Sequence, residues 1–141
     1  MTRIVVGVDG SELAAKALRR AVDEARLRDA KLDVVHAGPE PVIVAEPAWV
    51  APPPPDDVRA SALEVVDEML EGVSLEGVDI ERVAIVGNTA YELCGLAKGA
   101  DMLVVGSRGL GGFKGLLLGS VTQQVVAHAP CPILVVGPEG A

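Results

Sequence analysis

The chain has 141 residues and a formal net charge of −8, with 20 acidic against 12 basic side chains. That charge, with no run of Lys or Arg to offset it, argues against a nucleic acid or an anionic membrane as the main partner. Half of the residues are hydrophobic and only three are aromatic, so we expect a single domain over residues 1–141 whose core is built from Ala, Val, Leu and Ile.

Neither the cysteines nor the apolar segments indicate a metal, a redox motif or a membrane. Cys94 and Cys131 are far apart and neither belongs to a C-x-x-C pair, so we interpret both as small packing residues. The apolar run before Asp9 is too short for a signal peptide, and no stretch reaches about eighteen consecutive apolar residues. We therefore expect a soluble, cytoplasmic protein.

Five short apolar runs rich in Val and Ile are typical of strands covered on both faces. They are residues 4–8, 32–35, 80–86, 102–105 and 133–136. Between the first two runs, apolar residues recur at helical spacing while charged residues occupy the other face. This stripe consists of Ala14, Ala17, Leu18, Ala21, Val22 and Ala25. A second helix is expected to start after Asp56 or Asp57, which are acceptable N-caps.

Two further helices are predicted from their starting signals. The third begins near Asn88 or Thr89, since Thr89 and Glu92 have capping-box spacing and Asn88 competes for the cap. The fourth begins at Ser120, with Gln123 completing another candidate capping box. Strands and helices alternate throughout, so the sequence predicts an α/β layered domain with a mainly parallel sheet.

One segment, residues 38–55, interrupts this alternation with seven prolines, which bar a regular helix or a central strand. We interpret it as a surface loop. Two roles stay open: a spacer, or a flap over a ligand that uses Trp49.

A glycine-rich stretch follows the fourth apolar run, with six glycines among the fifteen residues from Gly106 to Ser120. Gly106, Gly109, Gly119 and Ser120 have the spacing G-x2-G-x9-G-S. A phosphate there would meet backbone N–H groups of the loop and of the next helix's first turn, at the positive end of its dipole. Glycine allows the close approach. The spacing matches neither a Walker A motif nor G-x-G-x-x-G. We therefore predict an anion-binding loop of another kind.

Side chains of this stretch leave two interpretations open. Arg108 and Lys114 either add positive potential to the loop or are solvated charges. Ser120 either contributes to binding or only caps its helix.

Asp9 lies at the end of the first apolar run, as Gly106 does at the end of the fourth. Ligands of open α/β sheets bind outside the carboxyl ends of the strands where the strand order reverses. If these two strands are neighbours, Asp9 faces the glycine-rich stretch, where it could accept a ribose hydroxyl or hold a magnesium ion that bridges phosphates. The alternative is a local cap in the sequence VDGS.

The opening RIVVGVDGS, the strand end VVHA and the segment from Ala100 to Val136 resemble the universal stress protein family, over essentially the whole chain. The resemblance implies a three-layer, Rossmann-like fold with a five-stranded parallel sheet in the order 3-2-1-4-5. It also implies the ATP-binding branch, whose loop of this glycine spacing holds phosphates and ribose. By position, Asp9 matches an acid near the ribose and metal, and Gly7 and Ala37 match backbone neighbours of the adenine. The loop is matched by Gly106, Gly109, Gly119, Ser120 and Val121. Ala37 is smaller than the aliphatic residue that members often have.

The hypothesis from the sequence is a regulatory protein that binds ATP with Mg²⁺ and acts as a switch. The alternatives are a slow ATPase, an AMP- or cyclic-AMP-binding protein, and an interaction module without nucleotide. The last strand, Ile133–Val136, leaves an open edge, which predicts a homodimer, as the resemblance also implies. His36 and His128 lack metal-ligand spacing and are interpreted as structural.

Overall fold

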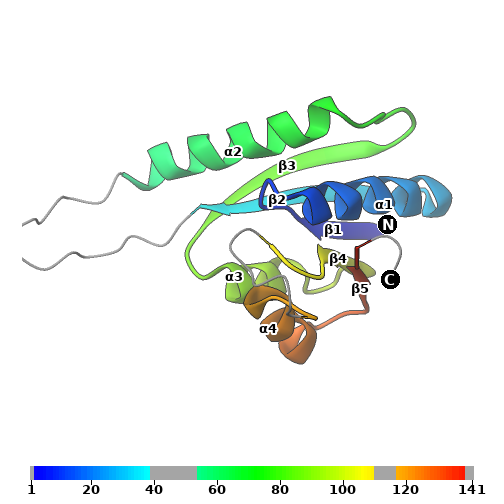
Figure 1. Cartoon of the computed structure of the whole chain (residues 1–141). Coiled ribbons are helices and arrows are strands. Elements are labelled where there is room, and N and C mark those ends of the chain that lie inside the picture. The colour runs from blue at the N-terminus through cyan, green and yellow to red at the C-terminus, as the bar shows by residue number, and fades with distance from the viewer. Residues whose placement is uncertain (1, 39–53, 110–116, 139–141) are drawn as a thin grey trace, which may run out of the picture.

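The computed structural model describes residues 2–38, 54–109 and 117–138. Helices and strands alternate along these residues (Figure 1). In chain order they are β1 Arg3–Gly7, α1 Glu12–Arg28, β2 Lys31–Gly38, α2 Pro55–Glu71, β3 Asp79–Val86, α3 Thr89–Leu96, β4 Met102–Gly106, α4 Ser120–His128 and β5 Ile133–Val136. Each of the five apolar runs forms a strand, with bounds that differ from the predicted ones by up to three residues at an end.

The five strands form one parallel sheet in the order β3-β2-β1-β4-β5, which confirms the predicted fold. Figure 1 shows α1 and α2 on one side of the sheet and α3 and α4 on the other. β1 pairs with both β2 and β4, with Gly7 opposite Val35 and Val6 opposite Val104. The strand order therefore reverses at β1. The chain adds β2 and β3 on one side of β1, and then adds β4 and β5 on the other side.

The core has one apolar cluster on each face of the sheet. All six residues of the predicted α1 stripe are buried, because they pack on β1, β2 and β4. On the other face, Leu93 of α3 and Val125 of α4 pack against Val5, Leu103 and Val105. Because both faces of the sheet are covered, the central strands do not alternate between apolar and polar residues.

The predicted start of α2 is wrong. The helix begins at Pro55, with Pro54 at the cap position and no side-chain cap hydrogen bond, so neither Asp56 nor Asp57 is the N-cap. Proline fits the first helical position because its φ is already helical and its missing N–H would have no partner there. Both aspartates lie instead in the first turn, where the positive end of the helix dipole favours them.

Neither candidate capping box forms, although the predicted starts of α3 and α4 and the alternative cap at Asn88 are confirmed. Asn88 caps α3 by accepting a hydrogen bond from the Tyr91 amide at 3.0 Å, so Thr89 is the first helical residue. In α4 the N-cap is Gly119, and the Gln123 side chain donates to the carbonyl oxygen of Leu118 at 2.9 Å. The glycine at the cap leaves α4 without a side-chain cap.

Arg3 ties the amino-terminal edge of the sheet to α3. Its guanidinium pairs with Asp33 of β2 at 3.0 Å and donates to the carbonyl oxygens of Leu96 and Lys98, at 3.0 and 2.9 Å, at the end of α3. Asp33 is buried, at 8% exposure, and its Oδ1 atom has no hydrogen-bond partner. One arginine thus neutralises a buried carboxylate and satisfies two terminal carbonyl groups.

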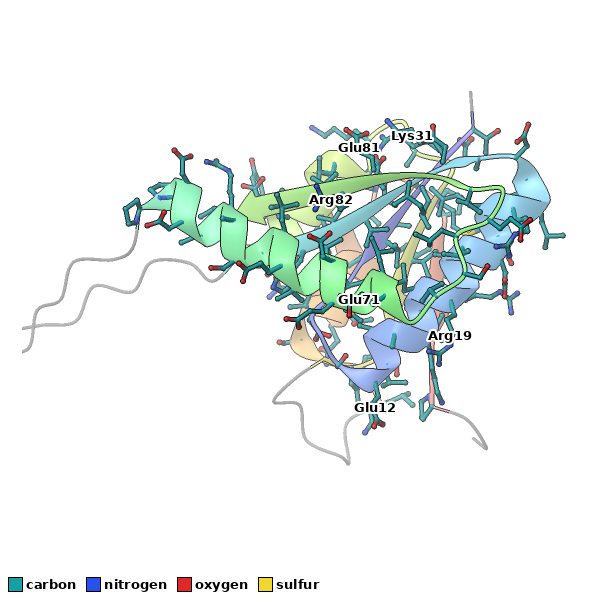
Figure 2. All side chains as sticks on the ribbon, turned by 90° about the horizontal axis from the view of Figure 1, so that it is seen from above. Glu12, Arg19, Lys31, Glu71, Glu81 and Arg82 are labelled. Atoms are coloured by element: carbon teal, nitrogen blue, oxygen red, sulfur yellow. The ribbon has the colours of Figure 1, made fainter. Side chains whose placement is uncertain are left out.

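Ion pairs connect β3 to α2 and to β2, and Figure 2 labels three of the residues involved, Lys31, Glu81 and Arg82. Arg82 of β3 donates to both oxygens of Asp67 on α2, at 2.7 and 2.8 Å, and Lys31 pairs with Glu81 across β2 and β3. Among the described residues, no helix is long and apolar enough to cross a membrane. The predicted flap with Trp49, and Lys114 of the glycine-rich stretch, lie outside the described residues.

Candidate functional site

A cavity of about 310 Å³ opens at the carboxyl ends of β1, β2 and β4. This is the place where the strand order reverses, and open α/β sheets bind their ligands there. The volume lies at the lower end of the range of about 300 to 1,000 Å³ that is typical of small-molecule sites.

The structure brings all nine predicted site residues to this cavity. They are Gly7, Asp9, Ala37, Gly106, Arg108, Gly109, Gly119, Ser120 and Val121. Eight further residues line it, which the sequence did not single out as site residues: Val8, Ala14, Val35, His36, Thr89, Leu93, Val105 and Thr122. Thr89 and Leu93 come from α3, and no sequence motif indicates that α3 reaches this end of the sheet.

The residues after β1 form a tight turn that fixes the Asp9 carboxylate. Its Oδ1 atom accepts a hydrogen bond from the Ser11 amide at 2.9 Å, and Gly10 between them has a φ of 87°. Ser11 in turn caps α1 by accepting from the Ala14 amide at 3.1 Å. One oxygen of Asp9 therefore acts as the local cap that was the alternative interpretation of VDGS. The other oxygen, Oδ2, faces Gly109.

The three glycines of the predicted motif each face close protein atoms. A Cβ atom on Gly109 would overlap Oδ2 of Asp9. One on Gly106 would lie 3.2 Å from the carbonyl carbon of Leu13 in α1, and one on Gly119 would lie 3.3 Å from the Cα atom of Arg108. Glycine at these positions thus allows Asp9, α1 and the start of α4 to lie close to the end of β4 and the residues after it.

The first turn of α4 is held against the end of β4 by two hydrogen bonds. The Gly119 amide donates to the Ser107 carbonyl oxygen at 2.7 Å, and the Thr122 hydroxyl donates to the Gly106 carbonyl oxygen at 2.7 Å. Ser120, Val121 and Thr122 then line the cavity from a turn that lacks a side-chain cap. Such a turn presents backbone N–H donors and the positive end of the helix dipole.

The cavity also has an apolar wall. Val35, Leu93 and Val105 belong to the core cluster beneath it and are buried. Gly7 keeps this wall open, since a Cβ atom there would lie 3.0 Å from Cδ1 of Leu93. The cavity therefore combines an apolar wall with a polar region that contains Asp9, Arg108 and the start of α4.

Residues 1–137 match the family model described as the universal stress protein family. The chain belongs to the universal stress protein family. This universal stress protein is 34% identical over 144 residues to Universal stress protein YxiE of Bacillus subtilis (strain 168), covering 95% of the chain and 97% of the relative.

Solved structures of the family share the fold. The universal stress protein UspA from Lactobacillus plantarum matches with a TM-score of 0.76 and 25% identity, over 96% of this chain and 97% of that one. A universal stress protein in complex with cAMP matches with a TM-score of 0.67 and 30% identity, over 96% of both chains.

Within residues 2–38, 54–109 and 117–138, no three His, Cys, Asp or Glu side chains form a group that could hold a metal ion by themselves. A metal at Asp9 would need most of its ligands from a bound molecule and from water. This donor set fits Mg²⁺, which is usually held by one or two carboxylates together with substrate phosphates.

Proposed function

We propose that this universal stress protein binds an adenine nucleotide in the cavity at the ends of β1, β2 and β4. The observation that carries the proposal is that Asp9 lines one cavity together with Gly109 and the uncapped first turn of α4, which come from a distant part of the chain. Further support comes from the relative that is 30% identical and is in complex with cAMP.

The two regions of the cavity suit the two ends of a nucleotide. Gly7 and Ala37 lie beside the apolar wall and would contact the base, while Asp9 would accept a ribose hydroxyl. The phosphates would be bound by the backbone of the loop and of α4. The residues for that role are Gly106, Arg108, Gly109, Gly119, Ser120 and Val121.

Local donors are needed because the chain as a whole repels anions. The net charge is −8, whereas each charge-assisted hydrogen bond contributes about 1.5 to 3 kcal/mol. Three or four such bonds would offset the repulsion. With ATP as the ligand, Mg²⁺ would neutralise part of the phosphate charge, and Asp9 is the residue that would hold it.

The protein would act as a dimeric switch rather than as a catalyst. β5 is an edge strand that pairs with β4, and its four apolar residues, Ile133–Val136, are all half-buried in the single chain. Such an edge favours pairing with a second copy. Nucleotide binding would change the surface that the dimer presents to partners.

Calorimetric titration with ATP, AMP and cAMP, with and without Mg²⁺, tests the site. We expect binding by the wild type, weaker binding by Asp9→Asn, and unchanged binding by Asp56→Asn, whose side chain is 98% exposed on α2. Equal affinity of all three proteins would contradict the role of Asp9, and no binding of any nucleotide by the wild type would refute the proposal. Light scattering at micromolar concentration tests the dimer separately, since a monomeric mass would rule it out.

A further inference from the structure

His36, which the sequence indicated only as structural, makes a short hydrogen bond at the cavity. Its Nδ1 atom lies 2.6 Å from the carbonyl oxygen of Val8. A carbonyl oxygen only accepts hydrogen bonds, so Nδ1 must carry a proton and donate it. In the neutral ring this leaves Nε2 as an acceptor.

This hydrogen bond acts on the residue directly before Asp9. The last β1 residue in register with β2 is Gly7, opposite Val35. Beyond it, the Val8 amide still donates to the Val35 carbonyl oxygen at 2.8 Å, and the Val8 carbonyl oxygen accepts from His36. Both backbone polar groups of Val8 are thus held by consecutive residues of β2.

The planarity of the peptide unit transmits this restraint to Asp9. The Val8 carbonyl group shares one plane with the amide nitrogen and Cα atom of Asp9, so fixing the carbonyl oxygen also fixes the orientation of that unit. On the other side, the Asp9 carboxylate is fixed by the Ser11 amide at 2.9 Å. Val8 is 5% exposed, so water is a poor replacement for the His36 donor.

We propose that His36 is a positioning residue: through the Val8 carbonyl group it holds Asp9 in the place where Asp9 contacts the nucleotide. The inference rests on the proposed nucleotide binding. The residue itself donates to the backbone and needs no contact with the ligand to have this effect.

A first test needs no nucleotide. Long-range ¹H–¹⁵N correlation spectra of the full chain, at a pH where the ring is neutral, report which nitrogen of His36 carries the proton. We expect the Nδ1–H form. A ring that is mainly Nε2–H would overturn the inference, whatever the protein binds.

A second test compares affinities. His36→Leu removes the donor, and we expect roughly tenfold weaker binding of AMP or ATP, because Asp9 is then no longer held where it contacts the nucleotide and about one hydrogen bond to the ligand is lost. His36→Asn places an amide NH₂ at the position of Nδ1 and should restore most of the affinity. The matched control is His128→Leu at the exposed end of α4, which should bind as the wild type does. Wild-type affinity in His36→Leu would overturn the inference.

A double-mutant cycle separates positioning from a general structural effect. If His36 acts through Asp9, His36→Leu should cause no further loss in an Asp9→Ala background, whereas additive losses would show that His36 acts elsewhere. Urea unfolding confirms that each variant is folded under the binding conditions. If His36→Leu does not fold, the affinity of His36→Asn and the protonated nitrogen of the His36 ring test the inference in its place. If the wild type binds no nucleotide, the proposed function is refuted. The ¹H–¹⁵N spectrum of the His36 ring then tests only the hydrogen bond to the Val8 carbonyl group.

Discussion

The carboxylate of Asp9 occupies the space that a Cβ atom on Gly109 would need. These residues follow β1 and β4, the two neighbouring strands at which the sheet order reverses. Oδ1 of Asp9 is held by the Ser11 amide, and Oδ2 lies on the side of Gly109. The glycine therefore matters for the geometry of Asp9 as well as for access to the loop backbone.

Gly109→Ala should displace the Asp9 carboxylate and weaken nucleotide binding by roughly tenfold, the effect of losing about one hydrogen bond. The cost in stability should be small, because the obstructing atom is the end of a side chain that can rotate away. Calorimetry measures the affinity and urea unfolding the stability. Gly72→Ala is the control, since a Cβ atom there meets nothing within 4 Å. Equal affinity of the two variants would show that the position of Asp9 is not critical.

Replacing Arg3 by Met should destabilise the fold strongly. Arg3→Met removes the closer ion-pair partner of the buried Asp33, leaving Lys31 at 4.0 Å from its Oδ1 atom, and it removes the donor from the Leu96 and Lys98 carbonyl groups. Breaking a fully buried pair costs about 3 to 5 kcal/mol, and we expect a loss toward the lower end of that range because Lys31 remains and the Arg3 side chain is 27% exposed. Arg59→Met removes an exposed pair with Asp56 and should cost at most about 1 kcal/mol. Urea unfolding measures both variants. Similar free energies of unfolding for Arg3→Met and Arg59→Met would contradict the stabilising role of Arg3.

Stability should fall in acid partly because of Glu24. Hydrogen bonds from Arg20 and Arg28 lower the pKa of this carboxyl group below its usual value. A depressed folded-state pKa stabilises the protein above the unfolded value of about 4.3, and this contribution is lost as the pH falls through the lower folded value. Glu24→Gln should therefore flatten the dependence of unfolding free energy on pH below about 4.3, measured by urea titration. An exposed control, Glu64→Gln, should keep the slope of the wild type.

The two thiols should react slowly with alkylating agents. Burial raises the pKa of Cys94 and of Cys131, so both stay protonated at neutral pH, and the thiolate is the reactive form. Mass spectrometry after a short exposure of the native protein to iodoacetamide should find little modification, with both sites modified after unfolding in urea. Rapid modification of the native protein would contradict their interpretation as packing residues.

Local patterns determined most of the fold. Apolar runs located all five strands and the α1 stripe located its buried face, because residues two, three or four positions apart interact within one element. The strand order came from the family resemblance, since periodicity does not specify which strands are neighbours. The starts of α3 and α4 were predicted correctly, whereas the start of α2 and the capping residues were predicted less well: proline geometry at Pro55 and the glycine cap at Gly119 prevailed over the expected side-chain caps.

The sequence by itself also indicated two of the segments that line the candidate site, since the glycine spacing and the acid after β1 are local features, but it did not indicate α3. Only the tertiary structure decided what these residues touch: Leu13 against Gly106, Asp9 against Gly109, and the His36 ring on the Val8 carbonyl group. These partners lie 28 to 100 positions apart in the chain. The nearest pair is His36 and Val8, and the most distant is Asp9 and Gly109. No local pattern encodes such pairs, because they form only when the parallel strands bring their carboxyl ends to one edge of the sheet.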